Sequence, residues 1–156
     1  MNKIYKLIIV GILLNINAFG QIEKGKMLIG GGFEFASANG GSSTSFSPNF
    51  GYMFTDNIMG GVELSTGGGS TSFAPFVRYY KPLKDQIFGF GQVGYSLSSP
   101  NTLTVGVGVN YFLFENVSIE PFFGFQRSSK SETSSGATVT QSTTTIGLNI
   151  GLQFFF

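Results

Sequence analysis

One short run of residues matches a motif with a defined binding chemistry. Residues 89–94 read GFGQVG, which fits the G-x-G-x-x-G pattern of dinucleotide-binding folds. In those folds the glycines must follow a strand and open a helix, so that the pyrophosphate lies at the helix N-terminus. Here YSLSSP follows, which is no helix start, and glycine occurs 23 times in the chain. We therefore interpret the run as part of a strand and expect no cofactor.

The residue types that are missing exclude several kinds of site. The chain has neither histidine nor cysteine, so the usual zinc sites, histidine-based triads and thiol nucleophiles are not possible. It also has no disulfide framework and no basic run longer than one residue. We expect a non-enzymatic protein without a metal or cofactor that does not bind nucleic acid.

The remaining chemistry lies in a set of polar residues that alternate with apolar ones. Four of them are charged: Glu34, Glu63, Arg78 and Glu120. Four amides occupy equivalent positions: Asn49, Gln92, Asn110 and Gln126. Charges in a protein interior must be paired or hydrated, because unpaired burial costs several kcal/mol. We predict that these eight residues form an interior network, with Arg78 and Glu120 as its ion pair.

The elements that position this set are β-strands. Apolar residues recur at every second position, and no stretch has a sustained helical period. The pattern predicts eight strands, at residues 26–36, 44–54, 58–66, 71–81, 87–98, 103–114, 117–126 and 143–156. In the fifth strand Phe88 and Phe90 have one parity and Val93 and Tyr95 the other, so we expect a bulge near Gly89 or Gly91.

The connections between these strands alternate in character. The second, fourth and sixth are tight turns, whereas the others are rich in Gly, Ser and Thr, and residues 127–141 form the longest predicted loop. An even number of strands with short turns on one side and longer loops on the other is typical of a transmembrane barrel. Such a barrel of eight strands is just wide enough to be filled by side chains, so the predicted network should plug it.

Aromatic residues and prolines refine the barrel hypothesis. The composition, with 18 phenylalanines and 23 glycines, suits aromatic side chains outside and small ones inside. The outward aromatics gather toward both ends of the strands, as interfacial girdles require. Prolines 48, 75 and 121 fall within predicted strands, where proline removes a backbone donor. We expect a local bulge at each of them.

The N-terminal twenty residues have the pattern of a secretory signal. Lys3 and Lys6 precede an apolar run at residues 7–14, and Ala18 and Gly20 supply small residues for cleavage. Eight apolar residues are too few to cross a bilayer core of about 30 Å. We predict a cleaved signal peptide at residues 1–20 and a single barrel domain at residues 21–156.

The final strand carries the most specific feature. Its even positions from Ile146 are all apolar and the sequence stops on an aromatic: Ile146, Leu148, Ile150, Leu152, Phe154 and Phe156. Together with the leader and the eight alternating segments, this strand resembles the small OmpA/OmpX-like outer-membrane β-barrel family. The chain departs from that family in having no tryptophan and in its prolines within strands.

The resemblance implies an all-β fold, an eight-stranded antiparallel up-and-down transmembrane barrel, in the outer membrane of a diderm bacterium. It implies contact with outer-membrane lipid and a structural, envelope-stabilising or surface-loop-presenting role. It also implies that the barrel assembly machinery reads Leu152, Phe154 and Phe156. Two alternatives stay open: a secreted or periplasmic lipocalin-like barrel that carries an apolar ligand, and a narrow outer-membrane pore. The sequence names no extracellular partner.

Overall fold

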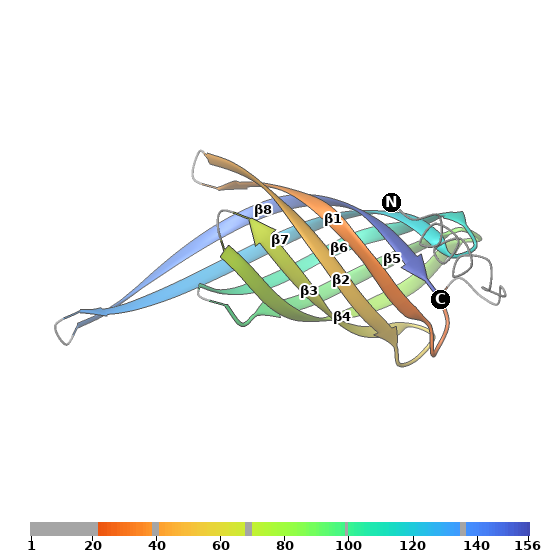
Figure 1. The fold of residues 1–156 in the computed structure, drawn as a ribbon, viewed down its shortest axis with the longest axis horizontal. Coiled ribbons are helices and arrows are strands. Elements are labelled where there is room, and N and C mark those ends of the chain that lie inside the picture. The colour runs from red at the N-terminus through yellow and green to blue at the C-terminus, as the bar shows by residue number, and fades with distance from the viewer. Residues whose placement is uncertain (1–21, 39–40, 68–69, 99, 135–136) are drawn as a thin grey trace, which may run out of the picture.

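The computed structural model of the protein describes residues 22–38, 41–67, 70–98, 100–134 and 137–156 (Figure 1). The predicted signal peptide lies outside the described residues. The eight strands are β1 (Met27–Ala38), β2 (Gly41–Met53), β3 (Ile58–Gly67), β4 (Ser70–Lys84), β5 (Ile87–Ser96), β6 (Asn101–Phe114), β7 (Val117–Ser134) and β8 (Ala137–Phe155). Among the described residues, no helix is long and apolar enough to cross a membrane.

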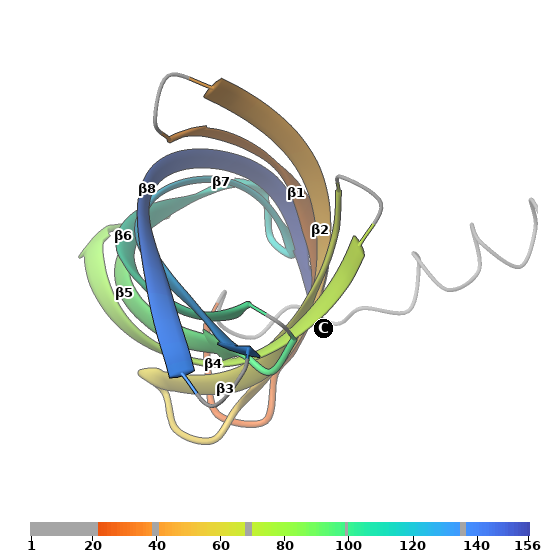
Figure 2. The same cartoon turned by 90° about the vertical axis from the view of Figure 1, so that its left-hand side faces the viewer.

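Each strand pairs antiparallel with the next, and β8 pairs with β1, so the sheet is a closed barrel. This confirms the predicted all-β, eight-stranded up-and-down fold. Figure 2 shows the resulting ring of strands, and Figure 1 shows them running obliquely to the long axis. The connections β2–β3, β4–β5 and β6–β7 lie at one end, with the C-terminus, and we call this the turn end. The opposite end is the loop end.

Successive side chains of each strand point to opposite sides of the barrel wall, as strand geometry requires. In β6, Leu103, Val105 and Val107 are exposed on the outside, and Val107 has 63% of its surface accessible. Asn110 and Phe112, of the other parity, are buried inside. The outer surface is therefore apolar, the reverse of a soluble protein.

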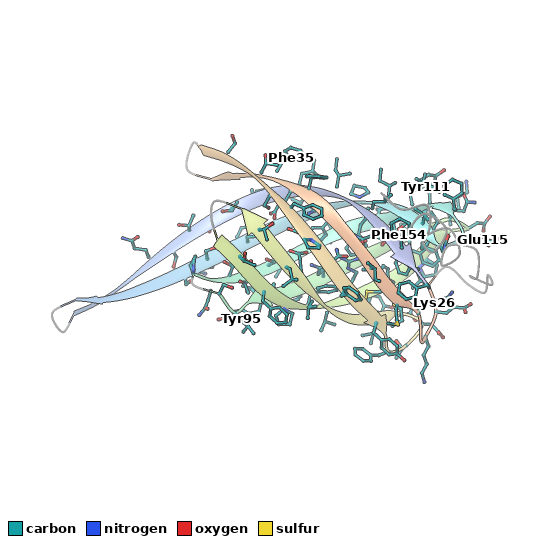
Figure 3. All side chains as sticks on the ribbon, in the orientation of Figure 1. Lys26, Phe35, Tyr95, Tyr111, Glu115 and Phe154 are labelled. Atoms are coloured by element: carbon teal, nitrogen blue, oxygen red, sulfur yellow. The ribbon has the colours of Figure 1, made fainter. Side chains whose placement is uncertain are left out.

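Outward aromatic side chains gather toward both ends of the barrel. Figure 3 shows Phe35 and Tyr95 toward the loop end, and Tyr111 and Phe154 toward the turn end. Charged residues lie beyond the second group, where Lys26 and Glu115 are found. A tyrosine ring with its polar hydroxyl favours such positions at a lipid–water boundary, and aromatic residues in general form girdles at both interfaces of transmembrane barrels.

The predicted bulge in the fifth strand is wrong. The pairing of β5 with β6 runs without a shift from Ile87 opposite Tyr111 to Ser96 opposite Thr102. Val93 and Tyr95 point outward, whereas Phe90 is buried inside and Phe88 packs partly buried against the core. The two parities therefore reflect two apolar faces of one regular strand, because the lumen here is itself apolar.

The bulges predicted at the three prolines are also wrong. Pro48, Pro75 and Pro121 each keep their register with one neighbouring strand, opposite Gly31, Val62 and Ile150. Because proline has no backbone N–H, the hydrogen-bonded pairing with the strand on its other side is interrupted. Pairing of β2 with β3 is interrupted between Phe46 and Asn49. Pairing of β4 with β5 begins only at Phe76. Pairing of β6 with β7 is interrupted between Gly108 and Tyr111. The register shifts instead occur near the turn end, at Pro82–Lys84 and Phe112–Phe114.

The long loop predicted at residues 127–141 is largely strand. Strand β7 continues to Ser134, and β8 begins at Ala137, with one unbroken register between them. The segment contains three threonines and a valine, whose branched side chains favour extended backbone. Likewise β1 ends at Ala38 and β2 begins at Gly41, inside the predicted 37–43 loop. The two ends of the barrel thus differ in how far the strands extend.

The hydrophobic core lies inside the barrel, toward the turn end. Tyr80, Phe90 and Phe112 are buried there, and the Phe112 ring lies 5.3 Å from that of Phe155. The other buried apolar members are Ile22, Leu28, Met53, Met59 and Phe76. The composition suggested an interior of small side chains, and this expectation is wrong for the turn end, where large rings fill the interior. Glycines on the inner face are placed where they leave room for these large rings.

Gly108 tests this packing. A Cβ atom there would lie 2.6 Å from Cε1 of Phe90 and 2.8 Å from the carbonyl oxygen of Pro121, and the backbone contact cannot be relieved by a rotamer change. We expect Gly108→Ala to lower the free energy of unfolding by about 1–3 kcal/mol through overpacking. The measurement is urea unfolding of the refolded protein in detergent, followed by circular dichroism.

Gly91→Ala is the matched control, because it makes the same change on the outer face. There a Cβ atom would meet only the carbonyl oxygen of Gly106, at 4.0 Å. A change within about 0.5 kcal/mol is expected. Equal losses in the two variants would show that the inner rings do not fix the glycine at position 108.

Candidate functional site

The lumen of the barrel has three layers along its axis. The aromatic core fills the turn end, a buried polar cluster around Arg78 lies on it, and an open polar cavity occupies the side toward the loop end. All eight predicted polar residues come from the inward parity of their strands. The structure divides them between the middle layer and the cavity, so they do not form one continuous network.

Arg78 on β4 is the centre of the middle layer. Its Nη1 atom lies 2.7 Å from Oε2 of Glu120 on β7, and only 2% of either residue is exposed. Nη1 also donates to the Tyr80 hydroxyl at 2.9 Å. Nε and Nη2 both donate to Oε1 of Gln92, at 2.9 and 2.6 Å. These bonds engage four of the five guanidinium N–H groups and fix the position of the guanidinium across the lumen.

Aromatic rings surround the same guanidinium. The Cζ atom of Arg78 lies 4.1 Å from the ring centre of Phe90, 5.2 Å from that of Phe76 and 5.8 Å from that of Tyr80. A guanidinium is weakly hydrated and stacks well on ring faces, so it tolerates such a site better than an ammonium group. The rings join the polar layer to the core, because all three also belong to the core cluster.

Other polar side chains complete this layer. Nε2 of Gln153 approaches Oε1 of Glu120 at 3.4 Å, and Nδ2 of Asn110 donates to Oγ of Ser118 at 2.8 Å. Three buried oxygens have no hydrogen-bond partner among the described atoms, one in each of Asn49, Asn110 and Gln153. The layer is thus well satisfied at Arg78 and less so at its edges.

Sequence reasoning missed several members of this layer. Tyr80, Gln153 and Ser118 were not among the predicted residues, although each has the inward parity of its strand. That parity was the available signal. Tyr80 was overlooked because the aromatic residues were expected to face outward, and Gln153 because its strand was interpreted mainly through its apolar face.

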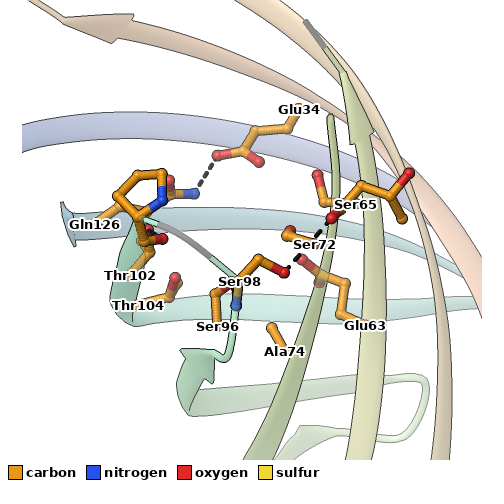
Figure 4. Close-up of a pocket in the computed structure, with 12 residues that line it drawn as sticks. Glu34, Glu63, Ser65, Ser72, Ala74, Ser96, Ser98, Thr102, Thr104 and Gln126 are labelled. Atoms are coloured by element: carbon orange, nitrogen blue, oxygen red, sulfur yellow. Dashed lines mark hydrogen bonds between the residues drawn. The ribbon is translucent and has the colours of Figure 1, made fainter. Parts of the chain in front are cut away.

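The cavity lies above this layer and has a volume of about 220 Å³. Glu34 on β1 and Glu63 on β3 both line it, and Figure 4 shows them projecting from different strands into the same space. The Gln126 amide donates a hydrogen bond to Oε1 of Glu34. Ser98 and Pro100, near the β5–β6 connection, lie on its rim, so the cavity reaches the loop end.

A much smaller space of about 20 Å³ continues below the cavity, between Glu63, Gln92 and Phe122. That is room for roughly one water molecule. Beneath it the buried side chains around Arg78 and the aromatic core occupy the lumen. The polar cavity is therefore a cup that is closed on the side of the turn end.

The glycine-rich run, the acidic residues and the terminal aromatics form no further site among the described residues. Residues 89–94 lie wholly within β5 and pair with β6, so they open no helix that would bind a pyrophosphate. In the part of the chain that the structure describes, no three His, Cys, Asp or Glu residues lie close enough together to hold a metal. Leu152 and Phe156 are exposed on the outer face of the closing strand and Phe154 is half-buried there. Their recognition during assembly stays a prediction.

Comparisons with known proteins agree on the fold. No family model matches the chain, and no curated protein matches its sequence. Solved structures do match. A structure from work on the de novo design of transmembrane β-barrels has a TM-score of 0.68 at 11% identity, covering 87% of this chain and 99% of that one.

Two natural outer-membrane proteins of Pseudomonas aeruginosa are similar as well. OprG has a TM-score of 0.56 at 17% identity, with 88% of this chain and 99% of that chain covered. The N-terminal β-barrel domain of OprF has a TM-score of 0.55 at 14% identity, with 84% and 98% covered. The chain therefore has the fold of small outer-membrane β-barrels, and the expected resemblance to that group is confirmed at the level of the fold.

The Arg78–Glu120 pair supports a prediction about stability. Arg78→Met removes the charge but keeps much of the side-chain volume, and it leaves the Glu120 carboxylate buried without its cation. We expect a loss of about 3–5 kcal/mol in the free energy of unfolding. Urea unfolding in detergent micelles measures it.

The double variant Arg78→Met/Glu120→Gln is the control. It removes both charges, and replacement of a whole buried pair is often close to neutral. Most of the lost stability should therefore return. A double variant as unstable as the single one would show that packing against Phe90, rather than the unpaired carboxylate, dominates the loss.

Proposed function

We propose that this protein is a non-enzymatic integral protein of a bacterial outer membrane that stabilises the envelope and presents a β-hairpin at the cell surface. The observation that carries the proposal is the apolar outer face of a closed barrel. Backbone groups in hydrocarbon must be bonded within the protein, and only helices and closed barrels achieve this. The exposed apolar residues of every strand then face lipid acyl chains.

The distribution of aromatic and charged residues supports the orientation that we propose. Phe35 and Tyr95 at the loop end, and Tyr111 and Phe154 at the turn end, are suited to the two interfaces. In this arrangement the loop end faces the exterior and the turn end, with Lys26 and Glu115, faces the periplasm. Outer-membrane barrels have short periplasmic turns and more extended external segments.

The lipocalin-like alternative fits the structure poorly. A soluble barrel that carries an apolar ligand needs a polar outside and an apolar cup. Here Phe33, Val77 and Val107 are each more than half exposed on the outside. The cup is lined by carboxylates and hydroxyl groups.

The hairpin of β7 and β8 supports the surface-presenting part of the proposal. Pairing of β7 with β6 ends at Ser129, and pairing of β8 with β1 ends at Ile146. Beyond these residues the two strands pair only with each other, and Figure 1 shows them projecting past the rest of the barrel. Their outer edges carry free backbone donors and acceptors, which can pair with an extended segment of another protein.

The membrane proposal predicts heat-modifiable mobility on a gel. An unboiled sample in SDS should run faster than a boiled one, because a closed ladder has no edge from which to fray. The protein should also be found in the outer-membrane fraction and need detergent for extraction. Equal mobility of both samples, with recovery in the soluble periplasmic fraction, would refute the proposal.

The plugged lumen predicts the absence of a steady current. The Arg78 cluster and the aromatic core fill the barrel below the cavity, so planar-bilayer recordings of the refolded protein should show no stable conductance. The double variant Arg78→Met/Glu120→Gln keeps the core and serves as a comparison, since it too should remain closed. A stable ohmic channel in the unmodified protein would favour a narrow pore.

A further inference from the structure

The cup at the loop end has an unbalanced charge. Glu34 and Glu63 both line it. The Arg78 guanidinium, the nearest cation in the layer below, is already bonded to Glu120, Gln92 and Tyr80. Among the lining residues that the structure describes, none is a lysine or an arginine. The charges of the lower layer therefore compensate each other, and those of the cup do not.

Glu63 is the key residue. It is deeply enclosed by neighbouring atoms, and it borders both the main cavity and the small space below it. Among the described residues, no hydrogen bond or ion pair reaches its carboxylate, whereas Glu34 accepts a bond from Gln126. A carboxylate confined without a partner has a large free-energy cost, and a second carboxylate facing the same space adds repulsion. A cation in the cup would remove both costs.

The lining indicates which kind of cation fits. Hydroxyl groups of Ser65, Ser72, Ser96 and Thr102 supply acceptors around the cup, while Ala74 supplies an apolar patch. An alkylammonium ion has N–H donors at one end and an apolar methylene chain attached to them. Hydrogen-bond acceptors beside a small apolar surface therefore match it.

The size of the cup also favours an organic cation over a bare metal ion. Glu34 lies opposite Ser45 of β2 and Glu63 lies opposite Asn49, so their backbones are about 10 Å apart across the sheet and about 13 Å apart along it. A volume of about 220 Å³ holds a molecule of several heavy atoms. Mg²⁺ and Ca²⁺ need several oxygen ligands within about 2.0–2.6 Å, and the described residues provide no cluster of three acidic side chains.

We propose that the cup formed by Glu34, Glu63 and the surrounding hydroxyl groups is a binding site for a small aliphatic diamine. One ammonium group binds the Glu63 carboxylate at the base, and the second binds Glu34 nearer the rim. The methylene chain lies along the hydroxyl-lined wall between them. Anions are excluded by the two carboxylates. The site depends only on a closed barrel, so it stands whether or not the protein stabilises the envelope or presents its hairpin.

The test is calorimetric titration of 1,4-diaminobutane into the refolded, full-length mature protein in detergent. We expect saturable binding near one equivalent, with 1,4-butanediol, which has the same length without charge, giving no heat of binding. Glu63→Gln should weaken the affinity by about tenfold or more, because an ion-paired hydrogen bond becomes a neutral one. Glu34→Gln should weaken it as well, by less, since that carboxylate shares its charge with Gln126.

Glu115→Gln is the matched control, because it makes the same chemical change at an exposed turn on the far side of the barrel. It should leave the affinity unchanged. Each variant is first checked for heat-modifiable mobility, which separates loss of binding from loss of folding. Removal of an uncompensated charge should not impair folding at position 63.

Three results would overturn the proposal. The first is the absence of any saturable diamine binding to the folded protein. The second is an equal affinity in Glu63→Gln and Glu115→Gln, which would place the amine on the surface. The third is saturable binding of Mg²⁺ or Ca²⁺ that competes with and exceeds that of the diamine, which would make the cup a metal site.

Discussion

Closure of the hydrogen-bonded ladder between β1 and β8 is the constraint on which the rest of this structure depends. Once Leu28 lies opposite Phe155 and Ser37 opposite Ile146, no strand between them has a free edge within the wall. Because successive side chains of a strand point to opposite sides of the wall, the outer and inner faces have different requirements. One face of every strand belongs to an apolar exterior, and the other must fill or line a narrow tube.

The tube is filled in a graded way. Large rings occupy the turn end, a guanidinium held between those rings and a carboxylate lies above them, and hydroxyl groups and carboxylates line the open part. Arg78 joins the aromatic part of the lumen to the polar part. The edge of its guanidinium forms the ion pair, and the face stacks on Phe90. The similarity to a structure from work on designed transmembrane barrels is a similarity of fold, so any proposal about a role has to be argued from the side chains of this chain.

The sequence predicted the wall far better than its contents. A period of two fixes which residues share a face, and this was enough to place eight strands and the inward side chains of Glu34 and Arg78. The period does not tell whether an inward face meets water or an apolar core. The inward Phe90 was therefore interpreted as evidence of a bulge, although it belongs to the core. The residues beyond Ser129 looked like a loop because they are polar and have no apolar face. In the structure the two strands pair there only with each other. The depth of the cup depends on which rings meet inside, and that follows from register between distant strands.

The prolines have a mechanical consequence. Pro48 interrupts the ladder between β2 and β3, and Pro121 interrupts the ladder between β6 and β7. Pro75 likewise leaves β4 and β5 unpaired before Phe76, so the three interruptions fall at every second junction of the ring. The other five ladders, including the closing pair of β8 and β1, keep an unbroken register, so the interruptions are local. Local opening of the wall is therefore easier at these three junctions than at the seam between β8 and β1 that closes the barrel.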